Sequence, residues 1–114
     1  MKNLTLDMKN LTLAQKVIWF NASLPMFARR KDMHVMVWYS KEHQEVRMMV
    51  EKRMTDTVVK CKFRSIPRRE IEFDEHYYFT LRHMLKQAID EMLEDLKQEA
   101  IEKGTYYEYD YGRG

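Results

Sequence analysis

Three neighbouring segments of the chain alternate between apolar and polar residues, and this pattern constrains the fold more than any other feature of the sequence. The segments are residues 33–39, 45–54 and 57–64, and short polar stretches separate them. A period of two is typical of β-strands that have one buried and one solvated face. Because the connections are short enough for hairpins, we expect an antiparallel meander of three strands.

The third segment, TVVKCKFR, alternates strictly between apolar and basic residues from Val59 to Arg64. With Thr55-Asp56 as a tight turn before it, we expect its apolar side to face the core and its basic side to be exposed. Cys61 then fills the core and is not a nucleophile. Together with the second strand, this arrangement predicts a basic face of the sheet that is suited to binding, formed by Arg47, Arg53, Lys60, Lys62 and Arg64, with Trp38 beside them.

Helical patterns flank the strands. Thr12 can cap a first helix, which Pro25 ends, and its apolar residues are Leu13, Val17, Phe20 and Leu24. After Pro67 interrupts the sheet, residues 70–73 can add a short edge strand. Asp74 can then cap a long helix that runs to about Lys103, with Gly104 as its stop. The apolar stripe of this helix is Tyr78, Leu81, Leu85, Ile89, Met92, Leu96 and Ala100.

The order of helix, three strands and helix predicts a two-layer α+β domain over residues 11–104, with a three-stranded sheet or a four-stranded one if residues 70–73 join it. Residues 1–14 contain a repeat, MKNLTLD followed by MKNLTLA, which we interpret as a duplicated start with Met8 as the original initiator. We therefore expect residues 1–10 to be peripheral to the fold. Residues 105–114 form a tail of tyrosines and acids. Because each tyrosine ring is a large contact surface, we expect the tail to make contacts through Tyr106, Tyr107, Tyr109 and Tyr111.

This order of elements is similar to that of double-stranded-RNA-binding domains. That family carries a lysine cluster at the start of its last helix, whereas this chain has the acidic stretch DEHYY at residues 74–78. Acidic residues at this place would repel phosphate, so the resemblance in order alone does not imply RNA binding.

The two parts of the chain carry opposite charge. Residues 29–69 hold twelve Lys/Arg and five Asp/Glu, a net charge of +7, whereas residues 70–114 hold five and twelve, a net charge of −7. Such asymmetry indicates a charged partner.

The last helix concentrates its acids in a binding face formed by Asp90, Glu91, Glu94 and Asp95. Like charges four residues apart each cost about 0.2–0.5 kcal/mol on an isolated helix. Opposite a basic surface the same acids become favourable, and that surface is either a partner's or this chain's own sheet.

Little in the sequence favours catalysis. The histidines are too far apart for adjacent-turn metal ligation, the single cysteine cannot form an internal disulfide, and no glycine loop is suited to phosphate. The longest apolar run near the N-terminus, residues 17–20, is too short for a membrane span. We therefore expect a cytoplasmic protein that is not an enzyme and needs no cofactor or metal.

Two functional hypotheses remain open. The first is a small regulatory protein that docks through its charged surfaces on a larger complex. The small size and the repeated start suggest a phage or mobile-element inhibitor of a machine that handles nucleic acid. The second hypothesis is direct nucleic-acid binding by the basic face and Trp38.

The charge asymmetry also predicts a weak homodimer, in which the acidic helix or tail of one protomer meets the basic sheet of the other. Salt would dissociate such a dimer. If pairing is instead apolar, through Trp38, Met49 or the tail tyrosines, salt would leave it intact or tighten it.

Overall fold

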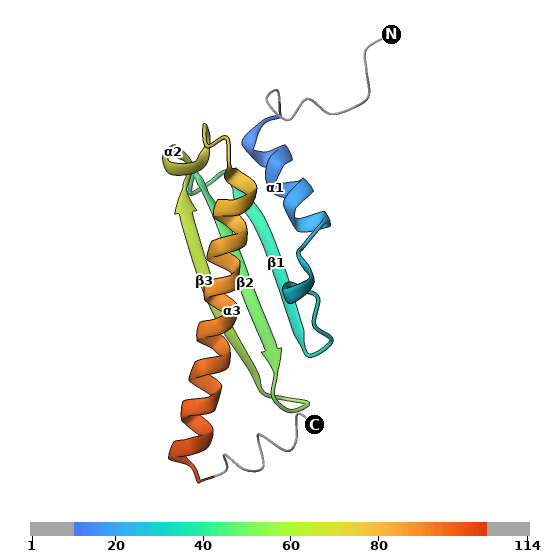
Figure 1. Ribbon diagram of the computed structural model, residues 1–114, viewed down its shortest axis with the longest axis vertical. Helices are drawn as coiled ribbons and strands as arrows, with labels where there is room; N and C mark the ends of the chain where they lie inside the picture. Colours follow the sequence, from blue (N-terminus) through green and yellow to red (C-terminus); the bar gives the residue numbers. More distant parts are fainter. Residues whose placement is uncertain (1–10, 105–114) are drawn as a thin grey trace.

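The protein has an α+β fold in which a three-stranded antiparallel sheet carries a long helix on one face (Figure 1). The computed structural model describes residues 11–104. In chain order the elements are α1 (Leu13–Ala22), the 3-10 turn η2 (Met26–Ala28), β1 (Met33–Ser40), β2 (Glu45–Arg53), β3 (Val59–Pro67), the short helix α2 (Arg68–Ile71) and α3 (Tyr77–Glu102). The predicted fold class is confirmed. The proposed segments 1–10 and 105–114 lie outside the described residues.

Helix α1 begins as the sequence predicts. The Thr12 hydroxyl accepts a hydrogen bond from the Gln15 backbone N–H, and the Gln15 side chain accepts one from the Thr12 N–H, which together form a capping box. Leu13, Val17 and Phe20 are buried on one side of the helix. On the side of β1, the Asn21 side-chain oxygen accepts a hydrogen bond of 2.8 Å from the Val37 N–H, so α1 is tied to the edge of the sheet.

The strands pair in the order β1-β2-β3, and their register decides which side chains share a face. Val50 pairs with Val35 on one side and with Lys62 on the other, so these three side chains point to the same face. By the same rule Met49 shares the opposite face with Met36 and Phe63.

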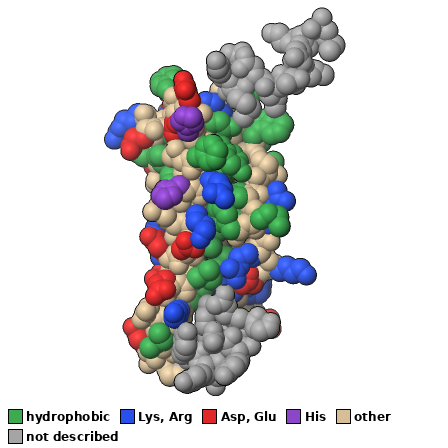
Figure 2. Space-filling view, viewed as in Figure 1, with side chains coloured by type: hydrophobic (Ala, Val, Ile, Leu, Met, Phe, Trp, Pro, Cys, Tyr) green, Lys and Arg blue, Asp and Glu red, His purple; other side chains and the backbone are tan. Residues whose placement is uncertain are grey.

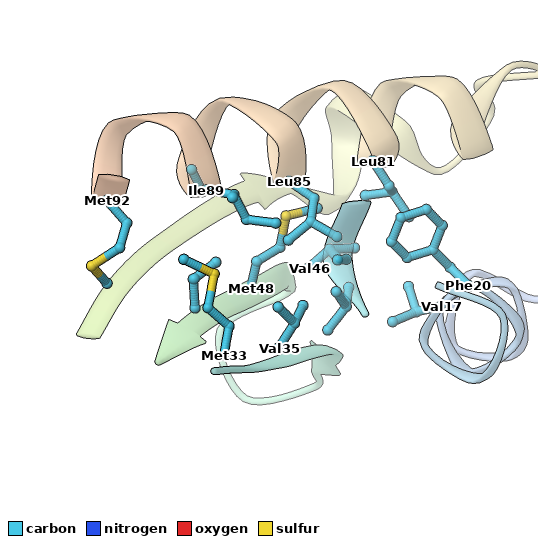
Figure 3. Close-up of a cluster of buried hydrophobic side chains, with 14 of the residues drawn as sticks. Val17, Phe20, Met33, Val35, Val46, Met48, Leu81, Leu85, Ile89 and Met92 are labelled. Atoms are coloured by element: carbon cyan, nitrogen blue, oxygen red, sulfur yellow. The ribbon is translucent and has the colours of Figure 1, made fainter. Parts of the chain in front are cut away.

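Helix α3 covers the first of these faces. Its predicted stripe is buried at every position except Tyr78, which is partly buried with its ring 5.3 Å from that of Phe20. Figure 3 shows Leu81, Leu85, Ile89 and Met92 pointing from α3 toward the side chains of the sheet. The core on the sheet side consists of Met33, Val35, Val37, Val46, Met48 and Val50. The helix ends before Gly104, which has a φ of +73° and therefore adopts the left-handed conformation that favours glycine after a helix.

Two local predictions about the segment after β3 are wrong. Residues 70–73 do not form an edge strand, because Pro67 precedes a helical turn, α2, in which Arg68 forms an ion pair with Glu72. Asp74 is not the capping residue of α3, since the helix begins at Tyr77. Its carboxylate nevertheless holds the start of the helix, because it accepts hydrogen bonds from the His76 N–H at 2.8 Å and from the Thr80 hydroxyl at 2.6 Å. These two bonds lower the pKa of Asp74.

The predicted faces of β3 are also wrong. Lys60, Lys62 and Arg64 point toward the side of the sheet that α3 covers, whereas Val59, Cys61 and Phe63 point away from it and are exposed. The cause is the turn before β3. Its loop spans Met54 to Val58, where the Thr55 hydroxyl accepts hydrogen bonds from the N–H groups of Thr57 and Val58. A two-residue turn at Thr55-Asp56 would pair Val50 with Cys61, but the longer loop shifts the register by one residue and reverses every side chain.

Candidate interaction surface

The basic side of β3 faces the acidic side of α3, and the two are joined by a row of ion pairs. Lys60 Nζ lies 2.5 Å from Glu99 Oε1, and Lys62 Nζ lies 2.6 Å from Asp95 Oδ2. Glu91 accepts from Arg64 and lies 3.8 Å from Lys62 Nζ. Figure 2, which views the helix-covered face, shows acidic and basic side chains next to one another there. The cations predicted for a binding surface are thus engaged within the chain.

This row has a physical reason in the position of β3 at the edge of the sheet. A lysine or arginine there can lay its alkyl stem along the rim of the core and keep its charged end in water. The acids of α3 lie one turn apart at Glu91, Asp95 and Glu99, so their spacing follows the helix repeat. The pKa of Glu99 is lowered, first of all by its hydrogen bond with Lys60.

The predicted acidic face divides into two parts. Glu91 and Asp95 contact β3, whereas Asp90 binds Lys86 at 2.8 Å within the helix and Glu94 accepts a hydrogen bond from Gln98 at 3.2 Å. The structure therefore does not bring these four residues together as one surface. The tail residues Tyr106, Tyr107, Tyr109 and Tyr111 lie outside the described residues.

A further ion-pair group fixes the start of β1. Asp32 accepts from Arg30 at 3.1 Å and from Lys52 of β2 at 2.7 Å. These two hydrogen bonds lower the pKa of Asp32 from 3.8 to about 2.

The Asp32 group predicts a component of acid lability. Because the folded-state pKa is the lower one, the stabilisation is present above pH 4 and is lost as the pH falls toward 2. Asp32→Asn should therefore flatten the fall in the free energy of unfolding between pH 4 and pH 2. The Asp32 side chain is 42% exposed, so we expect a loss of about 1 kcal/mol or less at neutral pH. Urea unfolding of both proteins at several pH values measures this, and parallel curves would contradict it. Asp74 and Glu99 shift in the same direction, so the variant should retain some acid lability.

The opposite face of the sheet, which we call the open face, carries an apolar row across all three strands. Met36, Met49 and Phe63 are paired neighbours, and Met36 is 41% and Phe63 59% exposed. Helix α3 covers the other face of the sheet, and α1 lies beside the β1 end of this row, where Ala14 and Ile18 line a surface pocket together with Met36. The sequence prediction missed Phe63 and Cys61 as surface residues, and only the length of the loop before β3 could have revealed them.

Polar rows flank the apolar row of the open face. In the row on one side of it, Arg47 of β2 lies between Trp38 of β1 and Ser65 of β3. The Nε of Arg47 is 2.7 Å from Glu45 Oε2. On the other side His34 and Cys61 flank Glu51. Arg53 ends β2 and reaches the Asp56 carbonyl at 3.4 Å. Of the predicted basic face, only Trp38, Arg47 and Arg53 therefore belong to the open face.

A surface pocket brings two aromatic rings of the open face together with two arginines, of which Arg64 belongs by register to the opposite face. Its lining consists of Trp38, Glu45, Arg47, Phe63, Arg64 and Ser65. Both arginines already have an acidic partner, Glu45 for Arg47 and Glu91 for Arg64. The pocket therefore combines apolar contact area with charges that are largely neutralised.

Neither a search for metal-binding groups and membrane-spanning helices nor the comparisons with known proteins indicates a function. Within residues 11–104 no three side chains of the metal-binding types are grouped, and no helix there has the length and apolar character needed to span a bilayer. No protein-family model, curated protein or solved structure matches the chain. The geometry of the open face is thus the observation from which a function can be argued.

Proposed function

We propose that the chain is a non-enzymatic protein-interaction module that docks on a protein partner through the open face of its sheet. The observation that carries this proposal is the apolar row of Met36, Met49 and Phe63, with Trp38 beside it. Met36 and Phe63 are exposed, whereas Met49 and Trp38 are partly buried. Apolar patches rimmed by polar residues are typical of protein interfaces, where aromatic residues, methionine and arginine are enriched. A regulatory role, such as inhibition of a larger complex, is in keeping with such a module.

The charged surfaces support the proposal in a different way from the one the sequence suggested. Because Lys60, Lys62 and Arg64 hold α3 on the sheet, their charges contribute to the fold. A partner would instead gain free energy by covering the apolar row, at about 25 cal/mol for each Å² of apolar surface removed from water. The charges of the open face would then set the orientation of the partner.

Capture experiments with a matched pair of variants test the proposal. Phe63→Glu places a charge in the apolar row, whereas Phe73→Glu changes a phenylalanine that is 87% exposed between α2 and α3, away from the open face. From a nuclease-treated lysate of the native host, the wild type and Phe73→Glu should retain the same proteins. Phe63→Glu should lose them, because a buried unpaired carboxylate is costly. Equal retention by all three proteins, each with an unchanged melting temperature, would contradict docking through the open face.

Nucleic acid is the second candidate ligand, and the pocket that joins Trp38, Phe63 and Arg47 favours it, since single-stranded bases stack on such rings. The carboxylates of Glu45 and Glu51 on the same face oppose it. Elution from an oligonucleotide column over a salt series separates the two candidates. A nucleic-acid module should lose affinity steeply as salt rises, in proportion to the phosphates that it neutralises. A protein-docking module should not be retained.

A further inference from the structure

The central strand of the open face has a charge pattern that reverses its sign about Met49. From one end of β2 to the other, the side chains of this face are Glu45, Arg47, Met49, Glu51 and Arg53. At equal distances from Met49 stand residues of opposite charge. The inner pair is Arg47 and Glu51, and the outer pair is Glu45 and Arg53.

Such a pattern is complementary to itself under one particular two-fold rotation. If the axis runs along the row of Met36, Met49 and Phe63, the rotation lays a second open face on the first with its strands reversed. Arg47 then lies over Glu51 of the copy, and Glu51 lies over Arg47 of the copy. The apolar row lies on its own counterpart, as an isologous interface requires.

The other face-to-face rotation is disfavoured by the same charges. An axis along β2 would lay each residue of the strand on its own counterpart, so arginine would face arginine and glutamate would face glutamate. Like charges placed opposite each other cost free energy at an interface. The charge order on β2 therefore selects the axis across the strands.

We propose that the partner of the open face is a second copy of this chain, bound across that two-fold axis with Met49 near its centre and with reciprocal Arg47–Glu51 ion pairs. The proposal rests on the proposed function, because it assigns a partner to the same docking surface. Sheets that pack face to face are about 10 Å apart, a gap that a long arginine and a glutamate can bridge together. Glu45 uses only Nε of Arg47, and a guanidinium has two further nitrogens that can reach a second carboxylate.

The inner pair should contribute more than the outer pair. Packed sheets are rotated by about 30°, so strands that coincide at the axis diverge along their length. Arg47 and Glu51 stand about 7 Å from the axis, whereas Glu45 and Arg53 stand about 13 Å from it. The divergence is therefore smaller at the inner pair, which makes this pair the one to test.

The dimer should be weak because the face is small. Three strands of eight or nine residues measure about 30 Å by 14 Å. The resulting area of roughly 400 Å² per protomer is about half of that in a standard interface. Association should accordingly be visible at about 0.1–1 mM and lost on dilution to about 1 µM.

Reciprocal charge variants test both the partner and the register. Arg47→Glu brings carboxylates face to face across the axis, and Glu51→Arg does the same with guanidinium groups, so each variant alone should be monomeric. An equimolar mixture of the two should associate, because every close pair is then opposite in sign. The double variant Arg47→Glu/Glu51→Arg should dimerise alone. Both residues are partly exposed, so we expect all variants to fold, and melting temperatures check this.

Sedimentation equilibrium over the stated concentrations is the measurement. The expected result is a dimer for the wild type, the mixture and the double variant, and a monomer for each single variant. A wild type that is monomeric at 1 mM would overturn the inference, and so would single variants that dimerise as well as the wild type or a mixture that stays monomeric. If the wild type is monomeric and Phe63→Glu still abolishes capture of another protein, the proposed function survives and only its partner is different.

Discussion

Replacing Leu85 with alanine should reduce the free energy of unfolding by about 2–5 kcal/mol. Leu85 is fully buried where α3 lies on the sheet, and a cavity there cannot be filled by small shifts of a long helix and three paired strands. A domain of this size has a total stability of about 5–15 kcal/mol, so the variant should melt at a much lower temperature. Urea unfolding followed by circular dichroism measures the change.

Phe63→Ala is the matched control for this variant, since it removes a larger side chain from the open face. Because Phe63 is 59% exposed, its loss should cost less than about 1 kcal/mol when measured at a dilution at which the protein is monomeric. Had β3 faced the core through its apolar side, Phe63→Ala would cost about 3–5 kcal/mol. Comparable losses for both variants would therefore show that the register of β3 differs from the one described.

Reversing the charge of Lys62 should destabilise the fold by about 1 kcal/mol. Its ammonium lies 2.6 Å from Asp95 and 3.8 Å from Glu91, so Lys62→Glu replaces attraction by repulsion between β3 and α3. Adding Asp95→Lys should recover part of the loss, because an oppositely charged pair forms again in the same place. A thermodynamic cycle of wild type, both single variants and the double variant gives the coupling free energy.

Lys41→Glu controls for the change in net charge, since this residue lies exposed in the turn between β1 and β2. It should change stability by less than about 0.5 kcal/mol. A coupling free energy of zero in the cycle would mean that Lys62 and Asp95 do not act as a pair in solution. High salt should reduce the coupling, because both side chains are partly exposed.

The layers of the fold were predictable because their signals are local. The capping box at Thr12, the stripe on α3 and the glycine after it each depend on a few neighbouring residues. The strands likewise show their period directly. Residues 70–73 misled the prediction because a four-residue apolar and polar alternation fits a strand and a helical turn equally well, and Pro67 favours the turn.

The candidate surface was not predictable in the same way, because it depends on how two strands are paired. The alternation of apolar and basic residues along β3 shows that Lys62 and Phe63 lie on opposite faces of the sheet. It does not show which of these faces is covered by the core. The loop from Met54 to Val58 decides this by a single residue of register. The opposite charges of strand and helix were visible in the sequence, and the structure shows that Lys60, Lys62 and Arg64 meet acids of the same chain.

The hydrogen bond from Val37 to Asn21 bears on how this protein avoids misassembly. An outer strand with unpaired amides is a template on which a strand of another molecule can add, and repeated addition leads to fibrils. In β1 one of these amides is occupied by a side chain of α1, so a foreign strand must first displace the helix. Detachment of α1 would require only local unfolding, which costs less than unfolding the whole domain. The resistance of the protein to aggregation therefore depends on how firmly this helix of ten residues stays in place.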